Sequence, residues 1–196
     1  MDQTSLSLLD RVRQSTDSRS WEQLAALYTP LMRQWLQAYE VQDADANDLI
    51  QDVLMVVARD VHGFDHNQRA GAFRKWLRTI LVHRLRHFWR SRGHQPMATG
   101  TSSLWERLDQ LEDEASPLSR IWNEQHDRDV IARLIDLVRP TFHPKTWEAF
   151  HRQMFGGQRP EQVAVELEIP LGSVYMARNR VLNALRREAA GLVDSP

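Results

Sequence analysis

The chain has 196 residues, of which 42% are hydrophobic and 26% are charged, and its formal net charge is −1, as in an ordinary globular protein with one or two small domains. It contains no cysteine, which excludes disulfide frameworks, thiolate nucleophiles and zinc sites with cysteine ligands. No apolar run approaches the roughly 18 residues of a membrane span and the N-terminal stretch lacks a secretory signal pattern, so we expect a cytoplasmic protein.

Apolar residues recur at steps of three and four through most of the chain, which is the period of helices rather than strands. In the first third of the chain this pattern predicts helices over residues 21–35 and 45–61. Asp43 or Asp45 is the expected N-cap of the second helix, where acidic residues complement the helix dipole. Residues 62–72 contain two glycines and are predicted to be a polar loop.

A basic helix is predicted next, over residues 73–92 with the sequence FRKWLRTILVHRLRHFWRSR. From His66 to Trp105 the chain has eight Lys or Arg and no Asp or Glu, while acidic residues crowd both flanks. This segregation predicts a surface that faces a polyanion, with the acidic blocks facing protein or solvent. Four cations lie off the apolar stripe of the helix and are expected to be available to a ligand: Lys75, Arg78, Arg86 and Arg90.

Taken alone, this basic segment also fits a solvated amphipathic helix with its aromatics turned inward. Aromatic side chains among cations beside a loop are, however, also typical of single-strand binding sites, in which the cations bind phosphates and the aromatic rings stack on unpaired bases. The sequence therefore leaves both interpretations open, and a second nucleic-acid module elsewhere in the chain would favour the functional one.

The following residues, 93–120, are rich in Gly, Pro, Ser and Thr and include a short acidic amphipathic piece, which predicts a flexible linker with one or two helical turns. Helical periodicity resumes at Trp122, and another helix is expected from Lys145 to about Phe155. No segment between turn-forming residues shows the alternation of apolar and polar residues that is typical of a strand. The fold class is therefore predicted to be all-α.

Residues 160–188 predict a helix-turn-helix, because Pro160 suits a first helical position and small and apolar residues are spaced for two short helices to pack across a turn. Glu168 lies in the turn, where the backbone tends toward positive φ and glycine is usual. Asn, Arg and Tyr on the outward face of the second helix could contact a major groove, although such a motif alone is equally compatible with plain packing. The expected outward side chains are Tyr175, Met176, Asn179, Arg180, Asn183, Arg186 and Arg187.

In this order, DANDLIQDVLMVVARDVHGF, the basic segment and the terminal helix-turn-helix resemble bacterial RNA polymerase sigma factors of the sigma-70 family, in the short extracytoplasmic-function (ECF) group. The stretch SPLSRIWNEQHDRDVIARLIDLVRPTFHPKTWEAF resembles the second half of that group. The resemblance implies two small helical domains, a sigma2-like domain over residues 1–92 and a sigma4-like domain over residues 121–196, joined by a flexible linker over residues 93–120.

The function implied by the resemblance is that of a promoter-specificity factor, which binds core RNA polymerase, recognises the −35 and −10 elements and promotes DNA melting. The implied partners are promoter DNA, the clamp helices of the largest polymerase subunit and the polymerase flap, with an anti-sigma factor as a further candidate. Such a protein would work in the bacterial cytoplasm, associated with the nucleoid. It would have no catalytic residues, no cofactor and no metal of its own.

Matching positions supply candidate site residues for each of these contacts. Those for core polymerase are Asp48, Leu49, Gln51, Asp52 and Met55. Those for the −10 element are Asn67, Arg69, Arg74, Lys75, Trp76, Arg78 and His83, with His83 standing where relatives usually have Asn. Those for the −35 element are Ser173, Tyr175, Met176, Arg178, Asn179 and Arg180, and several relatives carry Arg or Lys at the positions of Tyr175 and Met176, which implies a different −35 preference.

Two other classes of protein were weighed against this one. A conventional helix-turn-helix repressor or activator would bind operator DNA without replacing a sigma subunit, and it would have no need of the acidic helix over residues 45–61. A metal-dependent hydrolase of the HD type would use His126 and Asp127 or the histidine pairs 62/66 and 83/87. No Glu lies between the members of either pair to act as a base, so this third reading ranks last.

Overall fold

The structure is a computed structural model and describes residues 6–14, 18–64, 71–92 and 101–193. Within these ranges every regular element is a helix, as the apolar periodicity predicts. The first half holds α1 (Leu8–Gln14), α2 (Ser18–Gln37), α3 (Asp43–Asp60), the 3₁₀ turn η1 (Val61–Gly63) and α4 (Ala72–Ser91). The second half holds α5 (Thr101–Glu112), α6 (Pro117–Val138), the 3₁₀ turn η2 (Arg139–Thr141), α7 (Pro144–Met154), α8 (Pro160–Leu167) and α9 (Leu171–Ala189).

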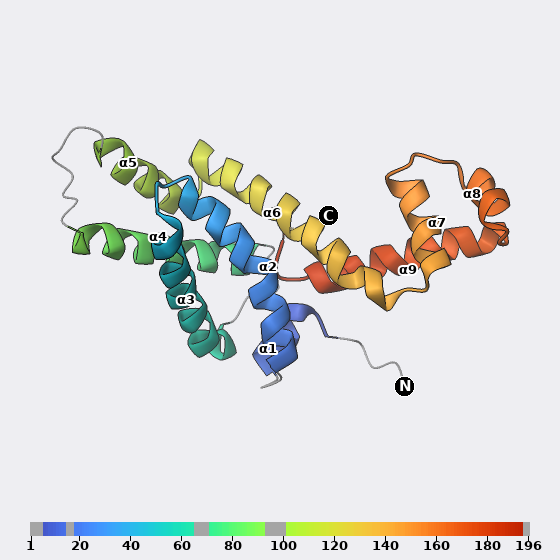
Figure 1. The fold of residues 1–196 in the computed structure, drawn as a ribbon, viewed down its shortest axis with the longest axis horizontal. Coiled ribbons are helices and arrows are strands. Elements are labelled where there is room, and N and C mark those ends of the chain that lie inside the picture. Colours follow the sequence, from blue (N-terminus) through green and yellow to red (C-terminus); the bar gives the residue numbers. More distant parts are fainter. Residues whose placement is uncertain (1–5, 15–17, 65–70, 93–100, 194–196) are drawn as a thin grey trace.

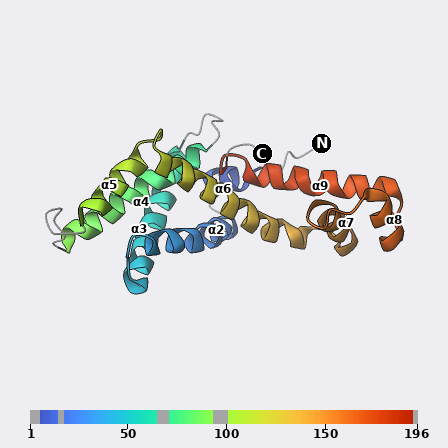
Figure 2. The same ribbon diagram turned by 90° about the horizontal axis from the view of Figure 1, so that it is seen from above.

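The helices build an elongated molecule with α3, α4 and α5 toward one end and α7 and α8 toward the other (Figure 1). Helix α6 runs between the two ends, and in the view from above α9 returns along it toward α1 (Figure 2). The chain terminus therefore comes back to the middle of the molecule. Helices α1 and α9, which are the first and the last along the sequence, are in contact.

Local signals explain where several helices begin. Ser116 is the N-cap of α6, and its hydroxyl accepts a hydrogen bond from the Ser119 amide over 3.0 Å, with Pro117 at the first helical position. Pro160 likewise opens α8. The predicted cap of α3 was wrong: Gln42 is its N-cap and makes no side-chain capping bond, while Asp43 and Asp45 lie in the first turn, where they complement the helix dipole.

The largest apolar core is shared by helices from both halves of the chain. It contains the inward faces of α2, α3 and α4, and it also takes in Trp122, Val130 and Leu134 of α6 and Leu192 and Val193 after α9. Two smaller clusters hold α7, α8 and α9 together around Trp147 and Val174. The division of the chain into residues 1–92, 93–120 and 121–196 stays a prediction, and the main core crosses both of its boundaries.

The stretch predicted as a flexible linker contains a twelve-residue helix, α5, rather than one or two turns. Leu108 and Leu111 of α5 are fully buried in the main core. The helix packs against both α4 and α6. Its length was underestimated because the leucines of α5 find their apolar partners on helices that are distant in sequence, which a local pattern does not reveal.

Candidate nucleic-acid interface

Basic side chains of α4 form a face that is defined here as Arg74, Lys75, Arg78, His83 and Arg86. Other helices cover three of them, Arg74, Arg78 and Arg86. Arg74 and Arg78 are buried, with 6% and 4% of their surface exposed. Arg86 retains 16% of its side-chain exposure. The expectation that Arg78 and Arg86 would be available to a ligand is therefore wrong for this arrangement of the chain. The reason is that side chains of α5 and α6 contact these arginines.

Arg74 is held by a carboxylate of α6. Its Nη1 donates to Asp127 Oδ2 over 2.6 Å, and the other carboxylate oxygen, Oδ1, lies 2.9 Å from His126 Nδ1. Because an ionised carboxylate only accepts hydrogen bonds, Nδ1 carries the proton of the neutral imidazole. Burial raises the pKa of Asp127, but the hydrogen bonds from His126 and Arg74 outweigh this effect and leave the pKa below its usual value.

His126 is itself almost fully buried and stacks on Trp122, with 5.3 Å between the ring centroids. It lines a cavity of about 220 Å³ between α2, α4 and α6, whose apolar wall includes Trp35 and Leu77. Its Nε2 has no hydrogen-bond partner within the described part of the chain. Burial lowers the pKa of His126, and the bond to Asp127 offsets this only in part. The ring is therefore neutral at pH 7.

Two side chains of α6 contact Arg78. Its Nη1 donates to Asn123 Oδ1 over 3.2 Å, and its guanidinium lies 5.5 Å from the centroid of the Trp122 ring. A guanidinium over a tryptophan face at this distance is a favourable cation–π geometry. Burial lowers the pKa of Arg78, an effect that nearby Glu114 opposes, and the group remains charged at any physiological pH.

The outer part of the basic face meets the acidic residues of α5 and of the turn after it. Arg86 donates to Asp109 Oδ1 and Glu112 Oε1, each over 2.5 Å. Lys75 forms an ion pair with Glu114. His83 Nε2 lies 3.6 Å from the same Glu112 carboxylate. We call Asp109, Glu112, Glu114 and Asp127 the acidic cover. The sequence shows an acidic block after the basic helix, but it did not reveal that these acidic residues contact the basic helix of the same chain.

Of the remaining −10 candidates, the structure describes Trp76, which lies near the start of α4. Trp76 is half-buried and stacks on Phe64, with ring centroids 4.6 Å apart and planes 19° from parallel. The two rings border a surface hollow that Arg59, Asp60 and Gly63 complete. Asn67 and Arg69 fall outside the described residues.

The candidates for polymerase binding lie on α3, and most of them face outward. Asp48, Gln51 and Met55 are exposed, Met55 with 62% of its surface accessible, and Asp52 is half-buried. An apolar side chain that is this exposed beside carboxylates is typical of a binding surface rather than of a core. Leu49 differs from the others because only 6% of it is exposed and it packs in the main core. We assign Leu49 to the core.

The helix-turn-helix forms as its sequence predicts. Val163 of α8 packs with Val174 and Ala177 of α9, and Ala164 and Ile169 flank them. Glu168 in the turn has φ 53° and ψ 49°, the left-handed conformation expected there, and its amide bonds back to the last turn of α8. This geometry fixes α9 across α8 with its polar side outward.

The candidate −35 residues share that outward side of α9. Tyr175 and Met176 are 45% and 50% exposed, Ser173 is half-exposed, and Arg178, Asn179 and Arg180 are exposed. Arg186 donates to Asn183 within the same helix, and Arg187 lies 3.5 Å from Glu188. A helix face of this composition can offer hydrogen bonds to base edges and phosphates at once.

Metal ligation was considered for the histidines. Among the described residues no group of three His, Cys, Asp or Glu side chains is placed to hold a metal ion. His126 and Asp127 bind each other, and Asp127 binds Arg74. His62 Nδ1 lies 2.8 Å from the carbonyl oxygen of Arg13, and His66 lies outside the described ranges. Over those same ranges, every helix is too short or too polar to cross a lipid bilayer.

Comparison with known families gives one match, within the first half of the chain. No curated protein matches the sequence. Residues 24–95, which run from α2 past the end of α4, match the family model of sigma-70 region 2. This range contains the outward acidic face of α3 and the whole basic face of α4. The segment that carries both faces is therefore similar to region 2 of the sigma-70 family of RNA polymerase sigma factors, which are DNA-binding proteins of transcription initiation.

Proposed function

We propose that this chain is a sigma factor of the ECF group and that it directs core RNA polymerase to promoters through three surfaces, one each on α3, α4 and α9. The observation that carries the proposal is the order of these surfaces along the chain: an exposed acidic face, a basic helix rich in aromatics and a helix-turn-helix with a polar outer face. A DNA-binding regulator that works without polymerase would need only the last of them.

The α3 surface is the proposed contact with the clamp helices of the largest polymerase subunit. Asp48 and Asp52 supply negative charge, and Met55 supplies an apolar side chain that excludes water from an interface. Asp48→Arg should weaken core binding at least tenfold because it reverses a charge at a complementary surface. Glu124→Arg on α6 is a matched control, since it reverses an equally exposed charge elsewhere.

The α4 surface is the proposed site for the non-template strand of the −10 element. Binding this strand separately from its complement would favour melting of the duplex. Arginine and lysine neutralise phosphates, and aromatic rings such as Trp76 stack on unpaired bases. Arg74, Lys75, Arg78 and His83 are the cationic candidates. The proposed −35 contacts of α9 are Ser173, Tyr175, Met176, Arg178, Asn179 and Arg180, which would lie in the major groove of duplex DNA while the same domain contacts the polymerase flap.

Run-off transcription tests the proposal directly. Core RNA polymerase is incubated with a pooled library of promoter fragments, with and without the protein, and the transcript starts are mapped. Discrete starts that require the protein support the proposal and give its −35 and −10 preferences together. Operator-like duplex binding with neither new starts nor core binding would instead favour a repressor or activator of the helix-turn-helix class.

A further inference from the structure

The acidic cover lies on the face of α4 that a DNA strand would need. We infer that in the free protein Asp109, Glu112, Glu114 and Asp127 occupy the single-strand site of α4 as an internal substitute for phosphates, so that the site opens only when α5 and α6 move away. The inference rests on the proposed function in one respect, the assignment of α4 to the −10 strand.

The first argument is chemical. Each cover residue contributes carboxylate oxygens to an arginine or lysine of α4, which is the pairing that phosphate oxygens make with the same side chains. Arg74 to Asp127 spans 2.6 Å, and Arg86 reaches two carboxylates over 2.5 Å each. Lys75 and His83 face Glu114 and Glu112. Cover and DNA therefore compete for the same donors.

The second argument is steric. Arg74 and Arg78 are more than nine-tenths buried, and the side chains that bury them include Trp122, Asn123 and Asp127 of α6. A DNA strand cannot reach these guanidinium groups while α6 stays in place. The burial is selective, because Asp48 and Met55 of α3 and Tyr175 of α9 remain exposed. The closed chain can therefore still present its proposed polymerase and −35 surfaces.

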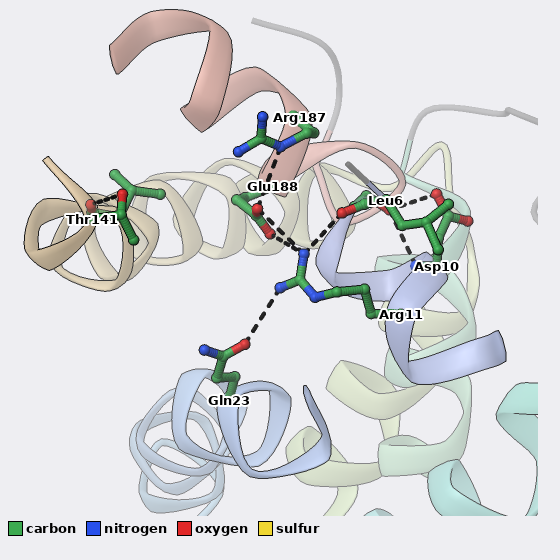
Figure 3. Close-up of polar contacts among 9 residues, drawn as sticks. Leu6, Asp10, Arg11, Gln23, Thr141, Arg187 and Glu188 are labelled. Atoms are coloured by element: carbon green, nitrogen blue, oxygen red, sulfur yellow. Dashed lines mark hydrogen bonds and ion pairs between the residues drawn. The ribbon is translucent and has the colours of Figure 1, made fainter. Parts of the chain in front are cut away.

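A third argument comes from the C-terminal end of α9, where a second contact joins the two halves of the chain (Figure 3). Glu188 is buried, and its carboxylate accepts from Arg11 Nη1 over 3.0 Å and 3.3 Å. Arg11 also donates to the Leu6 carbonyl and to Gln23 of α2. This contact ties α1 and α2 to the C-terminal helix, which packs along α6.

The outer ion pairs of the acidic cover are exposed to solvent. Asp109, Glu112 and Glu114 keep 71%, 38% and 54% of their side-chain exposure, so water and salt screen their ion pairs. Exposed pairs of this kind contribute little to stability. A polyanion or a polymerase surface that binds the open form better can shift such an equilibrium. The inner ion pair of Arg74 and Asp127 is less exposed to solvent, and it fixes the position of α6 along α4 in the closed form.

The test compares two variants with the same change in net charge. The release variant is Asp109→Asn, Glu112→Gln and Glu114→Gln, which removes the three outer carboxylates of the cover. The control variant is Glu40→Gln, Glu124→Gln and Asp136→Asn, which neutralises three exposed carboxylates elsewhere. Affinity is measured by fluorescence anisotropy with a labelled random-sequence single-stranded DNA of about 20 nucleotides.

A second readout reports closure independently of DNA. The chain has no cysteine, so Thr79→Cys on α4 and Ile121→Cys on α6, both at exposed positions, allow two spin labels to be placed and their distance measured. We expect one short distance in the otherwise unchanged chain and in the control variant, and a longer, broader distribution in the release variant. The release variant should also bind the single strand about tenfold more tightly than the control variant.

Each contrary outcome has a distinct meaning. Labels that are already far apart in the unchanged chain would overturn the closed form and leave the proposed function standing. Opening of the release variant without tighter DNA binding than the control variant would show that the cover does not mask a DNA site. Run-off transcription by the unchanged protein then decides separately whether the proposed function itself fails.

Discussion

The basic helix α4 and the recognition helix α9 have similar sequences in outline, since both combine arginines with an apolar stripe, yet they end in opposite environments. Val174, Ala177 and Val181 bury one side of α9, and the polar side stays exposed. Helix α4 is covered on more than one side, so that Val82 and Leu85 are fully buried and two of its arginines are buried with them. An amphipathic pattern therefore predicts which side chains face a core, but it does not reveal whether a second surface will cover the rest.

The largest effect should come from the inner contact of α4. Asp127→Ala leaves the buried Arg74 guanidinium without its 2.6 Å partner, and loss of one member of a buried pair costs about 3 kcal/mol of unfolding free energy. Urea denaturation followed by circular dichroism measures the change. Asp136→Ala, on the exposed side of the same helix, should change stability by no more than about 0.5 kcal/mol. Equal losses in the two variants would contradict the assigned role of Asp127.

The corresponding change on α9 should affect DNA and leave stability unchanged. Arg180→Ala removes an exposed cation from the proposed groove-facing side and should weaken binding to −35 duplex about tenfold, with no shift in melting temperature. Arg139→Ala, an exposed arginine in η2, is the control for a plain loss of charge. A similar loss of affinity in both variants would mean that α9 contributes only non-specific charge.

The buried His126, which lies beside the contact between Arg74 and Asp127, should make the free energy of unfolding depend on pH. Burial lowers the pKa of His126, so below its ordinary value of 6.5 the unfolded chain takes up a proton that the folded chain resists. Stability should be nearly independent of this group above that pH and should fall as the pH drops below 6.5.

The charged and titratable groups around this ring are Tyr28, Arg74, Asp127 and Asp129, and the carboxylate of Asp127 stays ionised across that range because its pKa is below 3.8. His126→Phe keeps an aromatic ring against Trp122 and removes the titration. Denaturation at pH 7 and pH 5 should therefore show a smaller pH effect in this variant. Equal slopes for the two proteins would rule out His126 as the cause.

The smallest expected effect lies in the turn of the helix-turn-helix. Glu168 has φ 53°, a conformation that glycine adopts without the strain of a side chain. Glu168→Gly should raise the unfolding free energy of the C-terminal helices by up to about 1 kcal/mol. Glu166→Gly, within α8, should lower stability because it places glycine in a helix interior. A destabilised Glu168→Gly variant would mean that the glutamate makes a compensating contact.

The helix-turn-helix followed from the sequence, and the exposed polar face of α9 is the best example, while its role in −35 recognition stays a prediction. Short helices with a proline at the start and a turn residue of positive φ are specified by neighbours a few positions away, so the pattern at Pro160, Glu168 and Val174 was enough. The burial of Leu49, by contrast, was not anticipated, because a position taken from a family motif carries no measure of how deeply its side chain sits.

The sequence by itself determined the all-α class, most helix positions, the polarity of α9 and the segregation of positive and negative charge along the chain. Only the tertiary structure decided that the acidic residues 109–127 lie on the basic face of α4 and that Arg11 meets Glu188. The physical reason is that local periodicity follows from steric and capping preferences within a few residues. Pairing across 23 to 177 positions depends instead on which apolar surfaces the whole chain can bury together.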